Sequence, residues 1–459
     1  MRSLLRLQAI RLELAVALLL RRRALIAKAH RARGSSLRAR RCCARKLRWL
    51  EPHRRKAAAL CFKEAERLRT DASSAADLRL AKLLYRTALV SGGRSIQAQA
   101  RAKYILMLCQ QQRPPAQRSG VQGLSLGPQG VKLRHHLING GFQCKLARGV
   151  LRYPREMPSA ATEALAALQP GPGVSCALDG ALPAEMLAKL QAAFAPDSPF
   201  WAEHAYTCGV SPFFSYVHSL EGPPRTGFDR VLRFLQGRAE ACGFFASRQA
   251  RYAEWWAHCR PHGVGHQVHF DSDDEGIGGI RNPIVSSALY LTGGGVGGPT
   301  LVTDQRRVGA GSGLARRGWL VLPKENRYLL FDGRLLHGVV PGRGVAGGGD
   351  GECTHGPWRE EPARRVTLMV AFWPHIRQRE SARPGAARPF PYEHVAPGAS
   401  SSVSWPSLFD WPTKEDGRPA EAPEPTPTPM RPIQPVWEPV DGEKMPDGMP
   451  EYDECFQGF

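Results

Sequence analysis

The sequence lacks the cysteine pattern of a disulfide-stabilised protein. Its 459 residues contain 11 Cys, an odd number, and no two of them are spaced as C-x-x-C. Disulfide scaffolds are mostly short secreted chains with even sets of cysteines. This cysteine usage therefore favours a reducing compartment.

A hydrophobic run long enough to span a membrane is also missing. The apolar run Leu14–Leu20 ends at Arg21-Arg22-Arg23, whereas a helix needs about 20 apolar residues to cross a bilayer. No other stretch is a better candidate. We therefore expect no transmembrane segment.

Most of the chain lacks an excess of positive charge, although the formal net charge is +22. The first 56 residues hold 18 Lys and Arg against 2 Glu, a net charge of +16, which leaves +6 for the other 403 residues. A surface that binds nucleic acid needs basic residues on the folded part of the chain. We therefore expect no specific nucleic-acid binding.

Residues 1–56 are thus a basic leader. An Arg-rich, acid-poor leader is typical of a transit peptide, which would direct the chain to a chloroplast or a mitochondrion. A signal peptide and a basic disordered arm remain alternatives. Without a targeting role, we expect a cytoplasmic protein.

Three further regions follow from composition and periodicity. Apolar residues at helical spacing predict a helical region at 57–118. Residues 119–261 read as a linker with supporting helices, and the Pro-rich, acidic composition of 377–459 predicts a disordered tail. Supporting helices are expected at Leu182–Phe194 and Phe228–Cys242, and the tail side chains that could still dock are Trp405, Trp411 and Trp437 with the closing Tyr452–Phe459.

A strand-rich core is expected at 262–376, where the period changes to that of strands from about Val268. Many short strands separated by Gly-rich turns favour a jelly-roll or barrel. The fold class is therefore α+β. The clearest expected strands are Ile284–Thr292, Thr300–Thr303, Trp319–Leu322, Tyr328–Phe331 and Val366–Trp373.

A candidate metal site begins at His269-Phe270-Asp271. On a strand, positions i and i+2 point to the same side, so this imidazole and this carboxylate converge. His337 follows the strand Tyr328–Phe331 and precedes a Gly and Pro turn, where it could supply a third ligand. Two His and one carboxylate suit non-haem iron(II) and leave coordination positions open. For His337 alone, a core histidine bonded to a backbone carbonyl is the alternative.

A candidate carboxylate anchor lies at the start of the strand V-T-L-M-V-A-F-W. Alternation places Arg365 and Thr367 on one face of this strand, and the core residues on the other. A guanidinium there can bind a carboxylate through two parallel hydrogen bonds, and the Thr367 hydroxyl could add a third. Arg364 falls on the opposite face and ranks second.

These segments together resemble the 2-oxoglutarate/Fe(II)-dependent oxygenase superfamily, and most nearly its prolyl 4-hydroxylase-like branch. The motifs are H-F-D, S-A-L-Y-L-T, G-G-P-T-L-V-T-D, L-H-G-V-V-P and R-V-T-L-M-V-A-F-W, in this order within about residues 262–376. The resemblance implies a double-stranded β-helix (jelly-roll) core with N-terminal supporting helices. It implies that His269, Asp271 and His337 are catalytic ligands of Fe(2+), and that Arg365 and Tyr290 bind 2-oxoglutarate, with core packing as the alternative for Tyr290.

The activity implied by this resemblance is a dioxygenase reaction that hydroxylates a C–H bond and releases succinate and CO2. The substrate would be a protein, with prolyl residues as one option, or a small molecule, and ascorbate could act as reductant. One departure is that 28 positions separate His337 from Arg365, so Gly342–Ala363 reads as an inserted surface loop. This leaves the choice between Arg364 and Arg365 open. The alternatives are a non-catalytic β-helix domain that binds a ligand or partner, and a cupin-type oxygenase that uses no oxoacid.

Two competing motifs are disfavoured. Gly293-x-Gly295-x-x-Gly298 fits a dinucleotide fingerprint, but a strand follows it instead of the helix that would hold a pyrophosphate. A zinc cluster is disfavoured because Arg260-Pro261 would break the helix needed to align its ligands. The members of that cluster would be His258, Cys259, His262 and His266.

Two sets of residues near the motif keep two interpretations each. Asp273, Asp274 and Glu275 form a solvated loop or a patch that recognises a basic substrate. Trp255 and Trp256 either line an entrance to the site or pack in the core.

Overall fold

The computed structural model describes residues 17, 37–111, 128–156, 163–206, 214–273, 281–307, 313–346, 363–378, 387–394, 404–411, 424–440, 445 and 455–458. Nearly all of the predicted leader, the acidic pair Asp274-Glu275 and most of the Gly342–Ala363 segment lie outside these residues. The chain divides into two compact units. The first comprises Met1–Arg152 with the short C-terminal pieces Glu438–Met445 and Pro450–Phe459, and the second comprises Tyr153–Trp437 with Pro446–Met449.

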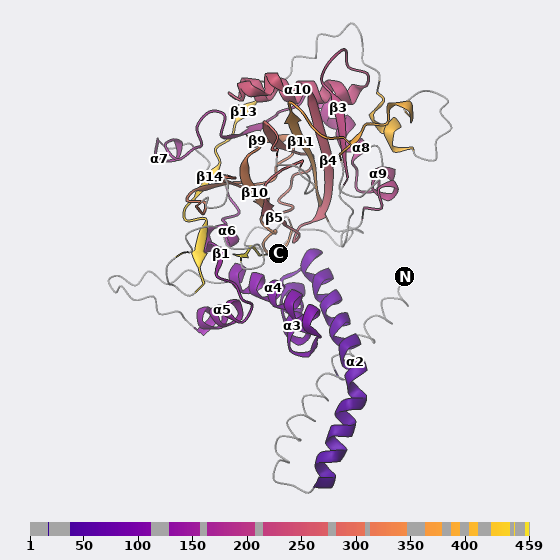
Figure 1. Ribbon diagram of the computed structural model, residues 1–459, viewed down its shortest axis with the longest axis vertical. Coiled ribbons are helices and arrows are strands. Elements are labelled where there is room, and N and C mark those ends of the chain that lie inside the picture. Colours follow the sequence, from indigo (N-terminus) through magenta and orange to yellow (C-terminus); the bar gives the residue numbers. More distant parts are fainter. Residues whose placement is uncertain are drawn as a thin grey trace. The chain divides into compact units, whose positions relative to one another are not determined.

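The first unit is built on helices that pack in sequence order (Figure 1). Ser74 caps α3 through a reciprocal capping box with Asp77, which satisfies two backbone N–H groups that would otherwise lack partners. No described helix combines the length and the apolar character required to cross a membrane. The helices are α2 (Leu37–Thr70), α3 (Ala75–Ser91), α4 (Arg94–Gln111), α5 (Pro128–Ile138) and α6 (Arg148–Leu151), and β1 (Cys144–Leu146) pairs with β16 (Cys455–Phe456).

The second unit contains two sheets. The larger has the strand order β12-β3-β4-β11-β6-β9-β2-β13, and the smaller has the order β14-β8-β7-β10-β5. All pairs are antiparallel except β12 with β3. The strands of the larger sheet are β2 (Ser175–Asp179), β3 (Ser215–Ser219), β4 (Tyr252–Pro261), β6 (Val285–Tyr290), β9 (Arg327–Asp332), β11 (Arg364–Trp373), β12 (Ala387–Pro389) and β13 (Thr426–Pro427). Those of the smaller are β5 (His266–His269), β7 (Thr300–Arg306), β8 (Gly318–Val321), β10 (Leu335–Val339) and β14 (Arg431–Ile433).

One face of the larger sheet is covered by helices, as the alternation in β11 predicts. Val366, Leu368, Val370 and Phe372 are buried with apolar residues of α8 and α10, which removes their apolar surface from water. α10 carries its own capping box, between Thr226 and Asp229. The covering helices are α8 (Ala184–Ala193), α9 (Pro199–Glu203) and α10 (Gly227–Ala241), with the 3-10 turn η2 (Phe245–Gln249), while the short helix α7 (Glu163–Ala166) contributes no described side chain to this core.

The α+β class and the five expected strands are confirmed, but the strand region begins earlier than predicted. Strands β2, β3 and β4 all precede Val268. β4 is the long central neighbour of β11 (Figure 1). Its residues alternate, with Ala253, Trp255, Ala257 and Cys259 on the core face and Glu254, His258 and Arg260 on the other.

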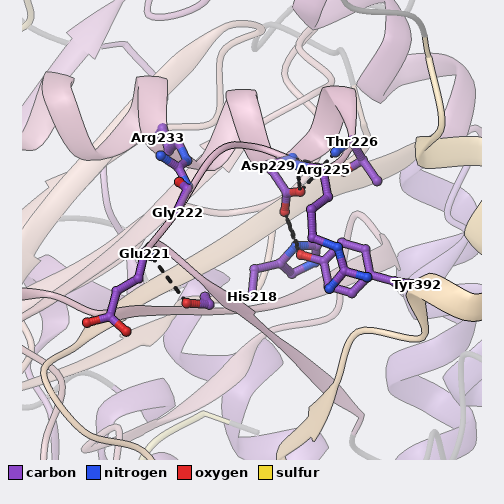
Figure 2. A network of polar contacts seen from close by, with 9 residues as sticks. His218, Glu221, Gly222, Arg225, Thr226, Asp229, Arg233 and Tyr392 are labelled. Atoms are coloured by element: carbon purple, nitrogen blue, oxygen red, sulfur yellow. Dashed lines mark hydrogen bonds and ion pairs between the residues drawn. The ribbon is translucent and has the colours of Figure 1, made fainter.

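The predicted disorder of 377–459 is wrong for the described segments of this region. η4 (Trp405–Phe409) places Trp405 and Phe409 in the core of the second unit, and Trp437 is also buried. η3 (Tyr392–His394) brings Tyr392 against β3 and α10. Figure 2 shows the Tyr392 hydroxyl directed at Asp229 beside His218. Docking of aromatic side chains offsets the entropic cost of ordering these segments.

Candidate metal centre

Two neighbouring strands of the smaller sheet position the two candidate histidine ligands. β10 pairs with β5, and His337 is the direct register partner of His269. Their ring centroids are 4.4 Å apart. Asp271 follows β5 two residues after His269, so the third group arises from the same local segment. One coordinating atom from each of the three residues lies within 4.8 Å of the others.

Backbone carbonyls fix the tautomer of both imidazoles. His269 Nδ1 donates to Gln267 O at 2.8 Å, and His337 Nδ1 donates to Leu335 O at 3.0 Å. A carbonyl can only accept, so the proton sits on Nδ1 in each ring. In the neutral form of each ring, Nε2 therefore presents a lone pair, which is the form that binds a metal.

These lone pairs face a carboxylate oxygen. Asp271 Oδ1 lies 3.5 Å from His269 Nε2 and 3.6 Å from His337 Nε2. His337 Nε2 is buried and has no hydrogen-bond partner. With both rings neutral, two lone pairs and an anionic oxygen repel one another unless a cation, either a metal ion or a proton on His269 Nε2, lies among them. Ligand atoms about 2.1 Å from one metal ion lie about 3 to 3.5 Å apart, so the residues present fit a metal ion.

Two further hydrogen bonds hold Asp271 in this orientation. Its Oδ2 accepts a 2.6 Å hydrogen bond from Ser286 on β6, and its backbone carbonyl accepts one from Asn282. Burial by itself would raise the pKa of Asp271, but the two histidines and Ser286 hold that pKa well below its usual range. Asp271 is therefore an anion that offers Oδ1 to the centre.

Burial determines the direction of the pKa shift of one candidate histidine ligand, His337. It lowers the pKa of His337 to about 4, so this imidazole is neutral at pH 7 and its Nε2 is free of a proton. For His269, Asp271 outweighs burial and raises the pKa. The His269 side chain is also 37% exposed, which makes it the ligand open to solvent.

A cavity adjoins the metal centre and brings the predicted oxoacid residues together. It has an empty volume of about 510 Å³, is open to solvent, and is lined by both histidine ligands and by Arg365, Thr367 and Tyr290. Thr367 on β11 is the register partner of Tyr290 on β6. All three candidate anchor residues therefore lie on the cavity face of the larger sheet.

The Arg365 guanidinium is nearly inaccessible to solvent and still charged. Its side chain is 2% exposed, and Nη1 donates to Gly298 O at 3.3 Å. Burial lowers its pKa to about 10, which leaves it protonated at pH 7. No ion pair to Arg365 is found within the described ranges. A buried cation without an acidic partner suits an anionic ligand.

The alternative anchor, Arg364, does not line this cavity. It is the first residue of β11 and pairs in register with Pro261, while its backbone carbonyl accepts from Thr292. Alternation directs its side chain to the other face of the sheet.

Tyr290 is tied to the smaller sheet by a 2.6 Å hydrogen bond between its hydroxyl and Thr300 Oγ1. The ring is buried. It therefore contributes both core packing and a polar atom at the cavity wall, so the two interpretations of this residue are not exclusive.

The zinc cluster and the dinucleotide fingerprint, the two competing motifs, are disfavoured by the structure for different reasons. Both nitrogens of His262 are used by the backbone, since Nδ1 accepts from Gly297 N and Nε2 donates to Arg343 O. No zinc cluster of this residue with its neighbours occurs among the residues that are described. The glycine motif leads into β7 and not into a helix. Of the two tryptophans, Trp255 packs in the core and Trp256 lines the cavity.

The acidic run after the motif is described only at Asp273, which forms an ion pair with Arg281. Asp274 and Glu275 lie outside the described residues. Three cavity residues were given no role by the sequence, namely His258, Arg260 and His266. The i, i+2 spacing of Trp256, His258 and Arg260 would have placed them on one face, had β4 been predicted as a strand.

No protein-family model matches the sequence, and no curated protein sequence matches it. Solved structures with which the chain aligns include a prolyl-4-hydroxylase from Pseudomonas putida, at 16% identity over 46% of this chain and 98% of that one, with a TM-score of 0.27. HygX from Streptomyces hygroscopicus, with nickel and 2-oxoglutarate bound, aligns at 12% identity over 50% and 96%, with a TM-score of 0.26. An oxidoreductase of the 2OG-Fe(II) oxygenase family from Burkholderia pseudomallei aligns at 13% identity over 48% and 94%, with a TM-score of 0.26.

Proposed function

We propose that this chain is an Fe(II)- and 2-oxoglutarate-dependent dioxygenase of the prolyl 4-hydroxylase-like type, with its two larger sheets as the halves of a double-stranded β-helix. The observation that carries the proposal is the pair of Nε2 lone pairs facing one oxygen of Asp271. A metal ion would relieve this repulsion, and the set of two imidazoles and one carboxylate suits iron(II). In this proposal His269, Asp271 and His337 are the ligands.

The oxoacid would lie between the metal and the buried guanidinium. Arg365 would grip the distal carboxylate with two parallel hydrogen bonds. Thr367 and Tyr290 stand on neighbouring strands at the same wall and would add hydroxyl donors. Because these groups are fixed by the sheet before any ligand arrives, they would orient the oxoacid with little reorganisation.

Bound iron would supply the oxidative decarboxylation of 2-oxoglutarate to succinate and CO2, coupled to hydroxylation of a substrate C–H bond. The protein's contribution would be to hold the partners in place and to limit water at the buried end of the cavity. The substrate would be a protein, with prolyl residues as one option, or a small molecule, with ascorbate as an auxiliary reductant.

The direct test is anaerobic titration of the protein with Fe(II) and 2-oxoglutarate, followed by admission of O2. We expect a metal-to-ligand charge-transfer band on addition of the oxoacid, and succinate after oxygen is admitted. Arg365→Met should weaken oxoacid binding at least ten-fold, whereas the matched variant Arg364→Met should not.

Other outcomes would support the competing functions. Iron binding without a charge-transfer band or succinate would favour an oxygenase that needs no oxoacid. Absence of iron binding would favour a non-catalytic binding domain and contradict the proposal.

A further inference from the structure

The cavity contains a second guanidinium that the proposed reaction does not use. Arg260 on β4 is the direct register partner of Arg365 on β11, and both side chains line the cavity. Arg260 Nη1 donates weakly to Gly265 O at 3.4 Å, and its Nε is buried without a hydrogen-bond partner. Within the described ranges neither guanidinium has a carboxylate at ion-pair distance.

Two imidazoles accompany Arg260 on the same wall. Alternation along β4 places Trp256, His258 and Arg260 on one face, and all three line the cavity. The ring of His266 lies 5.7 Å from that of His258 and 4.6 Å from that of His269. Nδ1 of His258 hydrogen-bonds with the Tyr206 hydroxyl at 3.4 Å, which leaves its Nε2 and the ring of His266 as the nitrogen atoms that lead from Arg260 towards the metal centre.

The formal charges of the cavity sum to a positive value that a second anion would balance. The one carboxylate of the centre, Asp271, is opposed by Arg260 and Arg365, so one positive charge remains. A divalent ion would raise this to three, and the two carboxylates of the oxoacid would return it to one. Glu254, farther along the same face of β4, does not line the cavity, and burial raises its pKa to about 7. Low-dielectric walls strengthen the attraction for an anion that enters.

We propose that Arg260, with His258 and His266, forms an oxyanion subsite beside the metal, separate from the Arg365 anchor, and that the substrate carries a carboxylate or phosphate group. This inference rests on the proposed function, since it takes Arg365 to be occupied by 2-oxoglutarate. A guanidinium binds either oxyanion in a planar, two-bond geometry. Trp256, at the end of this row, would pack against the rest of the substrate. Arg260 is thus a specificity-determining residue.

The test uses the full chain loaded with Mn(II) and saturating 2-oxoglutarate. Inorganic phosphate or acetate is then added, and the paramagnetic relaxation of its nuclei by Mn(II) is measured by NMR. This readout depends on distance from the metal and requires no turnover. We expect a saturable relaxation enhancement that Arg260→Met reduces at least ten-fold, while the affinity for 2-oxoglutarate changes less than three-fold. The probe with the larger Arg260-dependent effect identifies the oxyanion as a phosphate or a carboxylate.

Arg248→Met is the matched control, because Arg248 lies on η2 in an exposed ion pair with Glu240 and does not line the cavity. It should leave both measurements unchanged. Relaxation that persists in Arg260→Met would overturn the proposal, because the probe would then bind the metal itself. Loss of 2-oxoglutarate binding in Arg260→Met would also overturn it, because both arginines would then hold one molecule. A wild-type protein that binds Mn(II) but no 2-oxoglutarate would instead contradict the proposed function.

Discussion

The second unit contains two buried pairings of histidine with aspartate, and they differ in which ring nitrogen meets the carboxylate. His218 uses Nδ1, which donates to Asp229 Oδ1 at 2.5 Å. His269 and His337 give their Nδ1 protons to backbone carbonyls and turn Nε2 towards Asp271. The first arrangement is a hydrogen-bonded pair, whereas the second places unprotonated nitrogens against an anion.

The carboxylates of Asp229 and Asp271 also differ in the hydrogen-bond donors that surround them. Asp229 accepts from His218 and from the Tyr392 hydroxyl through Oδ1, and from the backbone N–H groups of Arg225 and Thr226 through Oδ2. Figure 2 shows these donors around Asp229, with the Arg225 guanidinium beside the Tyr392 ring. Asp271 Oδ2 accepts a hydrogen bond from Ser286. Its Oδ1 faces the imidazoles of His269 and His337. Within the described part of the chain, Nε2 is buried without a hydrogen-bond partner in both His218 and His337, so the two sites differ in the carboxylate. Both oxygens of Asp229 accept hydrogen bonds, whereas Oδ1 of Asp271 is left for a cation.

Among the substitutions that test this difference between Asp271 and Asp229, we expect the largest effect on catalysis. Asp271→Ala should lower succinate formation by about 100-fold or more, since loss of a ligand should cost more than the 10- to 100-fold typical of groups behind the ligands. Asp229→Asn should leave the rate per folded molecule within about three-fold. Rates are measured at saturating Fe(II) and 2-oxoglutarate. Equal loss in both variants would contradict the distinction.

Removal of the Asp229 carboxylate should act mainly on the stability of the fold. Asp229→Ala removes the charged hydrogen-bond acceptor of a buried neutral histidine and the capping carboxylate of α10, and should lower the free energy of unfolding by about 2 to 4 kcal/mol. Denaturant unfolding of the metal-free proteins measures this difference. Asp271→Ala should not destabilise the metal-free protein by as much, because among the described residues the Asp271 side chain accepts a hydrogen bond from Ser286 alone, whereas Asp229 accepts from His218, Tyr392 and two backbone N–H groups. A larger loss for Asp271→Ala would show that its network is closed without a metal.

Acid should weaken the His218–Asp229 pair in a defined pH window. Burial outweighs Asp229 and lowers the pKa of His218 from 6.5, while hydrogen bonds from His218 and Tyr392 outweigh burial and lower the pKa of Asp229 from 3.8 to about 2. Both groups bind protons more readily in the unfolded chain, so stability is lost as pH falls below about 6.5 and again from 3.8 to about 2. The Asp229 part amounts to about 2 to 3 kcal/mol.

This prediction is checked by denaturant unfolding at a series of pH values. Asp229→Asn should reduce the loss of stability between pH 3.8 and about 2 by the share of Asp229, about 2 to 3 kcal/mol. An unchanged acid slope in this variant would show that other carboxyl groups cause the loss.

The smallest effect should come from the contact behind the metal ligand. Ser286→Ala removes the hydrogen bond that orients Asp271, and should weaken Fe(II) binding about 10-fold. Ser287→Ala is the matched control, since Ser287 is buried on the same strand but donates to the Val370 carbonyl. Equal weakening in both variants would mean that packing, and not orientation of the carboxylate, is responsible.

The sequence was informative where spacing alone determines geometry. The i, i+2 relation brings His269 and Asp271 to one side, and alternation along β11 separates Arg365 from Arg364. Strand β4 was missed although Ala253, Trp255, Ala257 and Cys259 alternate with Glu254, His258 and Arg260, because His258 and Cys259 were considered only as members of a zinc cluster. Its cavity residue Arg260 was therefore missed with it.

The His218–Asp229 pair was missed for another reason, and the tail was predicted to be disordered although Trp405, Trp411 and Trp437 were named as side chains that could dock. Asp229 reads as a helix-capping residue, and nothing local predicts that Tyr392, 163 positions away, donates to it. The Pro-rich composition of 377–459 predicts disorder, because single aromatic residues such as Phe409 give no periodic signal. Such contacts depend on tertiary structure, which single-sequence patterns do not encode.

Anaerobic equilibrium dialysis against Fe(II), with wild type, Asp271→Ala and Asp229→Asn compared side by side, tests the central claim most directly. We predict that wild type and Asp229→Asn each bind one equivalent of iron, and that Asp271→Ala binds none at the same free concentration. Stoichiometric binding by Asp271→Ala, or no binding by wild type, would contradict a metal centre at His269, Asp271 and His337.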